Sequence, residues 1–363
     1  MHIAYVTNVR FPNERAHGQQ IQAVTQTLKE LGHDITIIAP FRNETKHVQR
    51  NDIRYVGSTD FIHSPFFPGI LGLWMVNHTM RKALPLELGS FDLLYTRSPA
   101  LLAPLVASGK PVILELHGIP RWNQSVFVRL CNQCGKVVCL TSPMKEELAR
   151  LGVSEDHLLI EGDAIDVRVL ARTMKKEQAR ERFHLPPGAF VVGYAGSFET
   201  MGLSKGVDQI IQAVETLHAE DRSIIALLAG GSSSASNDAV RHVGKIPHDD
   251  VSMVLAACDV LVYPAPNTHH PYFMRYTSPL KIFEYMAANR PIISADLPPI
   301  HDVLDASTAR FYEPGNIQAL MEQIQWVKTH PAEAHMMAEA SLEKVQSHTW
   351  QKRMERILLS IHS

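Results

Sequence analysis

The 363-residue sequence contains only four cysteines, and their spacing fits no disulfide framework. Cys131 and Cys134 form one C-x-x-C pair, but no second pair follows at zinc-site spacing, so we interpret both as small apolar residues on a helix. No run of 18 or more apolar residues is present, which argues against a membrane-spanning helix. The net charge of −2 lacks the basic excess that is typical of nucleic-acid-binding proteins.

The sequence also lacks the common nucleotide-binding glycine patterns. It has no Walker A loop, and no strand is followed by the G-x-G-x-x-G fingerprint, which disfavours a hydride-transferring dehydrogenase. The opening stretch, MHIAYVTNV, has neither the charged nor the apolar region of a signal peptide. We therefore expect a cytoplasmic protein with reduced thiols and no metal site.

What the sequence does contain is a regular alternation of short Val/Ile/Leu-rich segments with stretches of helical periodicity. Such apolar strands are typical of parallel sheets that helices cover on both faces. The predicted fold class is α/β, with two doubly wound Rossmann-like domains facing each other across a cleft. The predicted strands are 2–6, 34–40, 53–57, 92–97, 111–117, 136–141, 157–163, 190–197, 223–231, 241–246, 259–265, 290–296 and 309–314.

A charged stretch around 165–188, which ends in Pro-Pro-Gly, separates the two series of strands. We place an N-terminal Rossmann-like domain at 1–168 and a C-terminal one at 169–345. A final amphipathic helix within 346–363 is expected to cross back to the N-terminal domain. Because ligands of open α/β sheets bind beyond the carboxyl ends of the strands, candidate site residues should directly follow strands.

One candidate site follows the first strand of the second domain. That strand runs into Gly196 and Ser197, and Lys205 with Gly206 opens the next helix. Glycines let a ligand approach the backbone, and a lysine at the start of a helix is well placed for a phosphate. On these residues alone, a phosphate site and an ordinary surface turn are equally good interpretations.

A second candidate site is the stretch YTSPLKIFEYMAANRP, residues 276–291. Ser278 is a good N-cap, and Asn289 suits the left-handed end of a helix. The free N–H groups and the dipole of such a helix attract anions, and Lys281 in the first turn adds to that field. Glu284, one turn further, could accept hydrogen bonds from vicinal hydroxyls. The alternative is a packed helix with an i,i+3 ion pair between Lys281 and Glu284.

The order of these motifs, with LLAGG and VGKIPHDDVSMVLAACDVLVYPA between them, resembles glycosyltransferase family 4, the retaining group 1 enzymes of GT-B architecture. RAHGQQIQAVTQTLKELGHDITIIAP, DLLYTRSP and ELHGIP of the first domain also fit. The resemblance covers most of the chain, and the motifs of the second domain are the more specific ones. It implies an N-terminal acceptor-binding domain and a C-terminal domain that binds a nucleotide-sugar donor.

The resemblance also implies roles for the matching residues. Lys205 should bind the donor diphosphate, Glu284 should hold the ribose hydroxyls, and His117 should lie near the donor sugar. The implied catalytic residues are His117 and Lys205. The implied donor nucleotide and diphosphate site comprises Gly18, Gly196, Ser197, Lys205, Ser278, Leu280, Lys281 and Glu284.

One position departs from the family pattern. Tyr276 stands where the first glutamate of the family's E-x7-E motif would face the donor sugar, so the contacts of that glutamate should come from the neighbouring backbone. We assign sugar or acceptor contacts to Arg97, Phe273, Met274, Arg275 and Tyr276. The alternatives are a core histidine at His117, a helix cap at Arg97 and an enzyme that has lost its activity.

The implied reaction moves a sugar from a UDP- or GDP-linked donor to a hydroxyl of a glycan, lipid-linked or small-molecule acceptor. The resemblance implies retention of anomeric configuration, no metal and no cofactor besides the co-substrate, in cell-envelope polysaccharide or glycoconjugate synthesis. Two alternatives stay open. One is a nucleotide-sugar 2-epimerase of the same fold, and the other is a non-catalytic two-lobed sugar- or nucleotide-binding protein.

Residues 61–76, FIHSPFFPGILGLWMV, form the most apolar irregular stretch of the sequence. Prolines and glycines break it, so it is neither a clean strand nor a spanning helix. It is either a loop and helix buried against the first sheet, or an exposed aromatic patch that docks on a membrane or meets a lipid-linked acceptor. The second interpretation places the protein at the inner face of a membrane.

Overall fold

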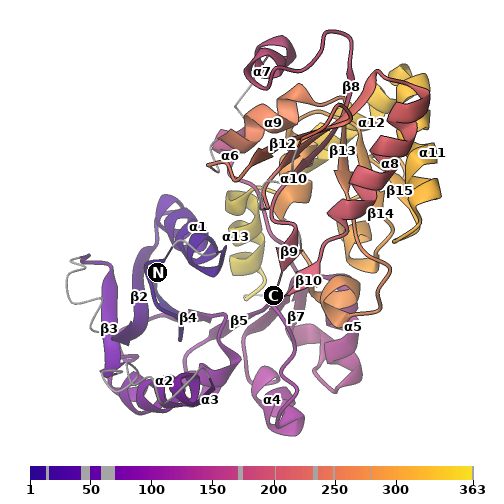
Figure 1. Cartoon of the computed structure of the whole chain (residues 1–363). Helices are drawn as coiled ribbons and strands as arrows, with labels where there is room; N and C mark the ends of the chain where they lie inside the picture. The colour runs from indigo at the N-terminus through magenta and orange to yellow at the C-terminus, as the bar shows by residue number, and fades with distance from the viewer. Residues whose placement is uncertain are drawn as a thin grey trace. The chain divides into compact units, whose positions relative to one another are not determined.

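The chain forms two compact units, each with its own sheet (Figure 1). Unit 1 comprises Met1–Gly162 and Trp350–Ser363, and unit 2 comprises Asp163–Thr349. The computed structural model describes residues 1–13, 16–41, 50–58, 70–170, 175–200, 202–231, 236–247, 250–278 and 280–361.

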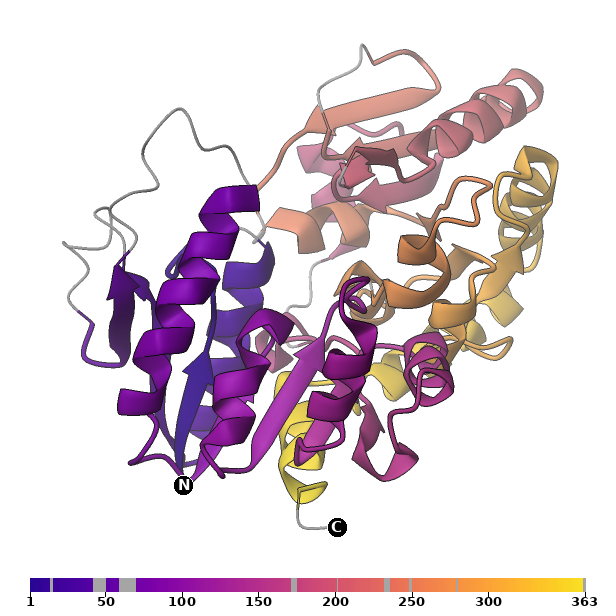
Figure 2. The ribbon, with the colours of Figure 1, turned by 90° about the horizontal axis from the view of Figure 1, so that it is seen from below.

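Unit 1 carries a seven-stranded sheet in the order β3-β2-β1-β4-β5-β6-β7, with every pairing parallel. The order reverses at β1, which pairs with β2 on one side and β4 on the other, so the switch point lies between β1 and β4. Figure 2 shows helices in front of and behind these strands. The strands are β1 (His2–Val6), β2 (Asp34–Phe41), β3 (Ile53–Ser58), β4 (Leu93–Thr96), β5 (Val112–Leu116), β6 (Lys136–Cys139) and β7 (Leu158–Ile160).

The helices of unit 1 come from both ends of the chain. The last one, α13, packs against α1 although its sequence follows unit 2. Its buried face is formed by Trp350, Met354 and Ile357 together with one arginine, Arg353. The helices are α1 (Ala16–Glu30), α2 (Ile70–Ala83), α3 (Leu102–Ala107), α4 (Gln124–Cys131), α5 (Ser142–Arg150) and α13 (Trp350–Leu359).

Unit 2 carries a six-stranded sheet in the order β12-β11-β8-β13-β14-β15, again wholly parallel. Its switch point lies between β8 and β13. The strands are β8 (Phe190–Ala195), β11 (Ile224–Ala229), β12 (Val240–Gly244), β13 (Val260–Tyr263), β14 (Ile292–Ala295) and β15 (Arg310–Tyr312).

The helices α8, α9 and α10 lie in three of the strand connections of unit 2, and helices pack their apolar faces on the sheet. A short antiparallel hairpin, β9 (Glu199–Thr200) and β10 (Leu203–Ser204), stands apart from the main sheet. A π-helical turn, Tyr272–Tyr276, precedes α10. The helices are α6 (Val167–Leu170), α7 (Lys176–Arg182), α8 (Val207–Glu220), α9 (Val251–Ala257), α10 (Leu280–Ala287), α11 (Ile317–Thr329) and α12 (Pro331–Val345).

The predicted α/β class with two doubly wound sheets is confirmed, and each predicted strand overlaps an observed one. The apolar runs identified these strands because parallel strands are buried on both faces. The strands β1, β5 and β11 illustrate this, since their interiors are almost completely buried. The hairpin β9–β10 was missed because each of its strands is only two residues long, too short to show a periodicity.

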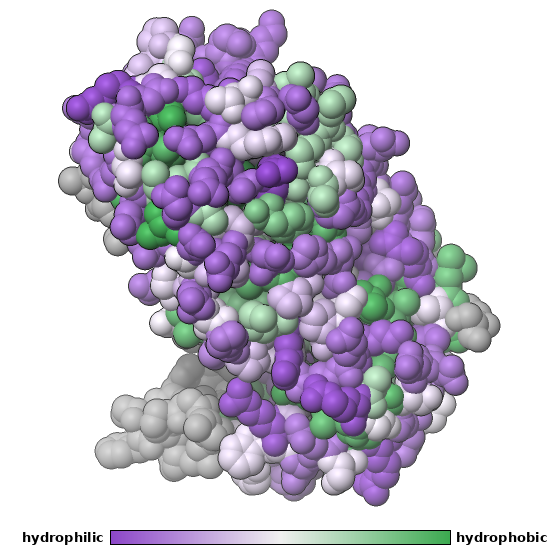
Figure 3. All heavy atoms as spheres, turned by 90° about the vertical axis from the view of Figure 1, so that its right-hand side faces the viewer, coloured by the Kyte–Doolittle hydropathy of each residue, from purple (hydrophilic) through white to green (hydrophobic). Residues whose placement is uncertain are grey.

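The apolar stretch 61–76 is described only in part, because residues 61–69 lie outside the described residues. On α2, Leu73 and Trp74 are 51% and 60% exposed, whereas Val76 is buried. Across the described chain, no helix has the length and apolar character that a membrane crossing requires. Hydrophilic side chains predominate on the face drawn in Figure 3, with smaller groups of hydrophobic ones between them.

Gly193, in the middle of β8, tests how tightly the core of unit 2 is packed. A Cβ at this position would collide with Sγ of Cys258 and lie 2.9 Å from Cδ2 of Leu261. Gly193→Ala should therefore lower the free energy of unfolding by about 1–3 kcal/mol, measured by urea denaturation.

Two further variants identify the cause. Gly89→Ala should be close to wild type, because a Cβ there meets nothing within 4 Å. Cys258→Ala removes the closest atom, so its combination with Gly193→Ala should cost less than the sum of the single changes. Strict additivity would contradict the proposed collision.

Candidate functional site

The site of unit 2 lies at the carboxyl ends of β8 and β11. Gly196 follows β8 with φ 142°, and a Cβ there would collide with Nζ of Lys281. Gly230 follows β11 with φ 110°, and a Cβ there would collide with the carbonyl oxygen of Gly196. Both positions therefore require glycine, and they let Lys281 and the Gly230 turn pack directly against the backbone that follows β8.

Two lysines converge on the segment that follows β8. Nζ of Lys281, in the first turn of α10, donates to the hydroxyl of Tyr194 at 2.8 Å and lies 4.4 Å from the centroid of its ring. That hydroxyl donates in turn to the carbonyl oxygen of Ser197 at 2.7 Å. Nζ of Lys205 donates to Oγ of Ser197 at 2.8 Å. Residues from β8, α10 and the end of the β9–β10 segment thus form one cluster.

Protonation of the two lysines is unfavourable in this cluster. Burial and, to a smaller extent, the neighbouring Lys205 lower the pKa of Lys281 to about 7, although Glu284 acts in the opposite direction. Burial also lowers the pKa of Lys205. Two crowded, partly buried ammonium groups are a favourable environment for an anion, because an anion would compensate both charges.

The segment before α10 is held by polar contacts. Oγ of Ser278 accepts a hydrogen bond from the backbone N–H of Asp163 at 2.7 Å, which the sequence did not predict. The hydroxyl of Thr277 donates to the carbonyl oxygen of Tyr272 at 2.6 Å. These contacts fix the π-helical turn and the start of α10, and π-helical turns occur frequently at functional sites.

The remaining predicted residues of unit 2 lie on or beside α10. Leu280 is its first residue and is 38% exposed, while Glu284 follows one turn after Lys281 and is partly buried. Within the turn, Phe273 is buried, whereas Met274, Arg275 and Tyr276 are partly buried. Asn289 has φ 51°, as predicted for the end of this helix.

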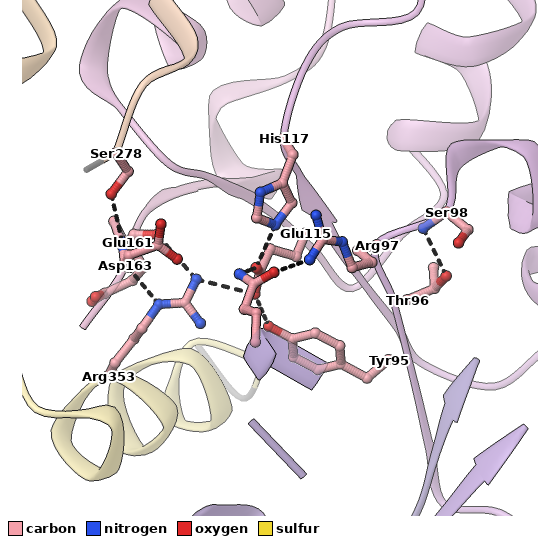
Figure 4. A network of polar contacts seen from close by, with 12 residues as sticks. Tyr95, Thr96, Arg97, Ser98, Glu115, His117, Glu161, Asp163, Ser278 and Arg353 are labelled. Atoms are coloured by element: carbon pink, nitrogen blue, oxygen red, sulfur yellow. Dashed lines mark hydrogen bonds and ion pairs between the residues drawn. The ribbon is translucent and has the colours of Figure 1, made fainter. Parts of the chain in front are cut away.

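Unit 1 contains a second polar centre, built around Glu115 of β5 (Figure 4). This carboxylate is completely buried. Its Oε1 accepts from Nε2 of Gln20 at 2.5 Å and lies 2.9 Å from Nε2 of His117. Its Oε2 accepts from the hydroxyl of Tyr95 and from the guanidinium of Arg353 at 3.0 Å.

These partners keep the buried carboxylate ionised. Burial opposes ionisation of Glu115, but Arg353, His117 and Tyr95 outweigh it and hold its pKa well below the usual range. The guanidinium of Arg353 also donates to the carbonyl oxygens of Gly162 and Glu161, at 2.5 Å and 3.2 Å. Such bonds satisfy a charge that would otherwise be costly to bury.

The other predicted residues of unit 1 lie beside this centre or on α1. Arg97 follows β4 and donates to Oε1 of Gln20, so it belongs to the same network. Gly18 is buried near the start of α1, where a Cβ would collide with the backbone of Asn13. His117, which follows β5, is 27% exposed at its side chain and therefore is not a fully buried core residue.

Within each unit, the structure brings the predicted residues together in part. Gly196, Ser197, Lys205 and Lys281 form one cluster in unit 2, and Arg97 is linked to His117 in unit 1 through Gln20 and Glu115. Sequence analysis missed the residues that support them, which are Tyr194, Gln20, Tyr95, Glu115 and Arg353.

Two of these omissions left a signal in the sequence. Glu115 is the one charged residue within the apolar strand VILEL, and a charge in such a strand needs partners. Arg353 shares the apolar face of α13 with Trp350, Met354 and Ile357 at helical spacing. Nothing local in the sequence indicates that the two side chains meet.

Among the described residues, no group of three or more His, Cys, Asp or Glu side chains is arranged to hold a metal ion. Cys131 and Cys134 are buried free thiols, as small apolar residues would be. Cys131 ends α4, but Cys134 lies in the bend after it, so the prediction that both are on a helix was wrong for Cys134. Burial raises the pKa of Cys134 to about 12, so this side chain stays a thiol.

Two family models match the sequence. The one described as Glycosyl transferases group 1 matches residues 189–330, within unit 2, and the one described as Glycosyltransferase Family 4 matches residues 18–162, within unit 1. Comparison with curated proteins gives no significant match.

Solved structures with the same fold include Anabaena HepE in complex with UDP, at 15% identity, a TM-score of 0.71 and 100% coverage of both chains. HepE in complex with UDP-glucose matches at 15% identity and a TM-score of 0.70, over 100% of this chain and 99% of that one. Sucrose-phosphate synthase from Thermosynechococcus elongatus matches at 17% identity and a TM-score of 0.72, over 99% and 98% of the two chains.

The lowered pKa of Lys281 should make the free energy of unfolding depend on pH. The folded protein binds fewer protons than the unfolded chain between about pH 7 and the ordinary lysine value of 10.5, so this group adds stability as pH rises through that window. Below about pH 7 its full penalty is present. Lys281→Met should therefore raise the free energy of unfolding by about 2 kcal/mol near pH 6, with a gain that shrinks towards pH 10.

Urea denaturation at several pH values measures this effect. Lys328→Met is the matched control in unit 2, because Lys328 is paired with Asp221 and bonds Oγ of Ser223 at 2.9 Å. Its removal should not stabilise the protein at any pH. A loss of stability in Lys281→Met near pH 6 would show that the lysine is not under electrostatic strain.

Proposed function

We propose that this chain, which belongs to the family 4, group 1 glycosyltransferases, transfers a sugar from a UDP-linked donor to an acceptor hydroxyl. The observation that carries the proposal is the convergence of Lys205 and Lys281 beside the bare backbone of Gly196. We choose UDP because HepE, which shares the fold, is known in complex with UDP and with UDP-glucose.

In this proposal the diphosphate replaces the contacts that the two lysines make with the protein. Lys281 now donates to a tyrosine hydroxyl and Lys205 to a serine hydroxyl, both neutral partners that a charged phosphate would outcompete. The first turn of α10, with the amides of Leu280 and Lys281, adds a dipole of the same sign. The diphosphate would thereby relieve the repulsion between the lysines.

The rest of the donor would extend from this anion site. Glu284 lies one helical turn from Lys281, a spacing of roughly 5–6 Å between Cβ atoms. Its carboxylate would accept hydrogen bonds from the ribose hydroxyls. The π-helical turn at Tyr272–Tyr276 would contact the donor sugar through its backbone, since Tyr276 supplies no carboxylate.

The chemical step is the departure of the diphosphate as positive charge develops on the sugar. Preorganised donors stabilise the leaving charge, and each one contributes roughly 3 kcal/mol. Because Lys205 and Lys281 supply the positive charge that a divalent cation supplies elsewhere, we propose a metal-independent reaction. We further propose retention of configuration, with the departing diphosphate accepting the proton of the acceptor hydroxyl on the same face.

Unit 1 would supply the groups that face the acceptor and the sugar. His117 and Arg97 are the candidates. Gly18 on α1 is assigned on the family resemblance alone, because Asn13 fills the space beside it where a Cβ would lie. We place the acceptor among glycans and lipid-linked carriers, in polysaccharide or glycoconjugate synthesis. These assignments rest on the family resemblance and on the position of the residues after β4 and β5.

The donor site predicts the behaviour of two variants. Lys205→Ala and Glu284→Ala should each weaken UDP binding about 10- to 100-fold, because each removes a charge-assisted hydrogen bond. Isothermal titration calorimetry measures the Kd. Lys328→Ala is the control, since Lys328 lies on α11 and is paired with Asp221. Wild-type affinity in both site variants would overturn the assignment.

The proposed chemistry also predicts what happens to a donor without an acceptor. Incubated with UDP-glucose in EDTA, the protein should release UDP and glucose slowly, with water as acceptor and the α-anomer appearing first. Proton NMR detects the anomer before it equilibrates. An epimerised UDP-sugar would instead favour the 2-epimerase, and initial β-glucose would contradict retention.

A further inference from the structure

The buried carboxylate of Glu115 contacts His117, and the proposed reaction gives this contact no role. Oε1 of Glu115 and Nε2 of His117 lie 2.9 Å apart. The side chain of Glu115 is 1% exposed, whereas that of His117 is 27% exposed. Figure 4 shows the other ring nitrogen of His117 on the side away from Glu115. One edge of the imidazole is therefore fixed by the protein, and the opposite edge is not turned toward the carboxylate.

The direction of each hydrogen bond around Glu115 follows from groups that can only donate. Arg97 has no acceptor, so it must donate to Oε1 of Gln20, which turns the amide nitrogen of Gln20 toward Glu115. Arg353 likewise can only donate, and it does so to Oε2. The network therefore converges on Glu115 as an acceptor.

An ionised carboxylate accepts and cannot donate, so Nε2 of His117 must carry the proton in this contact. In the neutral imidazole, Nδ1 is then an acceptor. Nδ1 thus presents a lone pair on the edge of the ring that faces away from Glu115. A sugar hydroxyl is a suitable donor for that position.

We propose that Glu115 is a positioning residue for His117: it fixes the Nε2–H tautomer and so presents Nδ1 as an acceptor for a hydroxyl of the sugar or of the acceptor. Arg353 of α13 holds Glu115 in place. The proposal deepens the proposed function and rests on the assignment of His117 to the sugar-facing site. Through Arg353, the carboxyl-terminal helix α13 would then help to orient His117.

A purely structural role for Glu115, as the partner of Arg353, makes a different prediction. In that case the tautomer of His117 would not depend on Glu115. The two roles separate in Glu115→Gln, because an amide has one oxygen and one NH2 group. Gln20 also donates to Oε1, so Glu115→Gln is made throughout on a Gln20→Leu background, which by itself should keep the Nε2–H tautomer. Arg353 can only donate, so the amide oxygen must face Arg353 and the NH2 group must face His117.

The test reads the tautomer of His117 directly. Long-range ¹H–¹⁵N correlation spectra of histidine-labelled protein distinguish Nε2–H from Nδ1–H, and His117→Gln assigns the signal. Wild type should show Nε2–H, and Glu115→Gln should show Nδ1–H. Nδ1–H in wild type, or Nε2–H in Glu115→Gln, would overturn the proposal.

Two further variants test Arg353 and guard against a loss of structure. In Glu115→Gln combined with Arg353→Met, the amide is free to turn its oxygen toward His117, so Nε2–H should return. Tyr95→Phe removes a donor to Oε2 but keeps the carboxylate, so it should retain the wild-type tautomer. If Glu115→Gln does not fold, the wild-type spectrum still decides the tautomer.

UDP titration of wild type, by calorimetry, separates this proposal from the proposed function. The lysines that define the donor site belong to unit 2, whereas Glu115 and His117 belong to unit 1. Absence of UDP binding would count against the transferase assignment without changing the tautomer. A tautomer that does not respond to Glu115→Gln, in a protein that binds UDP, would count against the positioning role alone.

Discussion

Burial of parallel strands on both faces is the constraint on which the rest of this structure depends. Strands such as β1 and β11 have no solvent-facing side, so their residues are almost all apolar. Polar chemistry is therefore concentrated where strands end, as at Gly196 after β8 and His117 after β5. The same constraint makes a charge inside a strand unusual, and Glu115 is such a charge.

The lysine cluster has the features expected of the proposed anion site. Lys205 and Lys281 are bonded to neutral hydroxyls, and their mutual repulsion is only partly offset by Glu284. A protein that needed only a stable fold would gain by replacing one of these lysines with an apolar residue. Their presence is explained if an anion completes the site, which is how helix N-termini and nearby cations bind phosphates.

The fold could be predicted from the sequence because its signal is local. An apolar run marks a strand by itself, and every predicted strand is present. The lysine cluster could be predicted in part, since Lys205 and Lys281 each stand beside a recognisable turn or helix start. Their shared neighbour Tyr194 could not, because its contact with Lys281 joins residues 87 positions apart. The pair of Glu115 and Arg353 is separated by 238 positions, and no periodicity relates the two.

That distant pair also bears on why the chain retains a buried ion pair at all. Burying two charges costs desolvation, and well-packed apolar residues often replace such pairs without loss of stability. Stability alone is thus a weak explanation for Glu115 and Arg353. A carboxylate that must be ionised, immobile and directed at one edge of His117 is a stronger one, because no apolar residue can fix a tautomer. Arg353 then has a specific task, which is to keep that carboxylate charged and correctly oriented at the centre of unit 1.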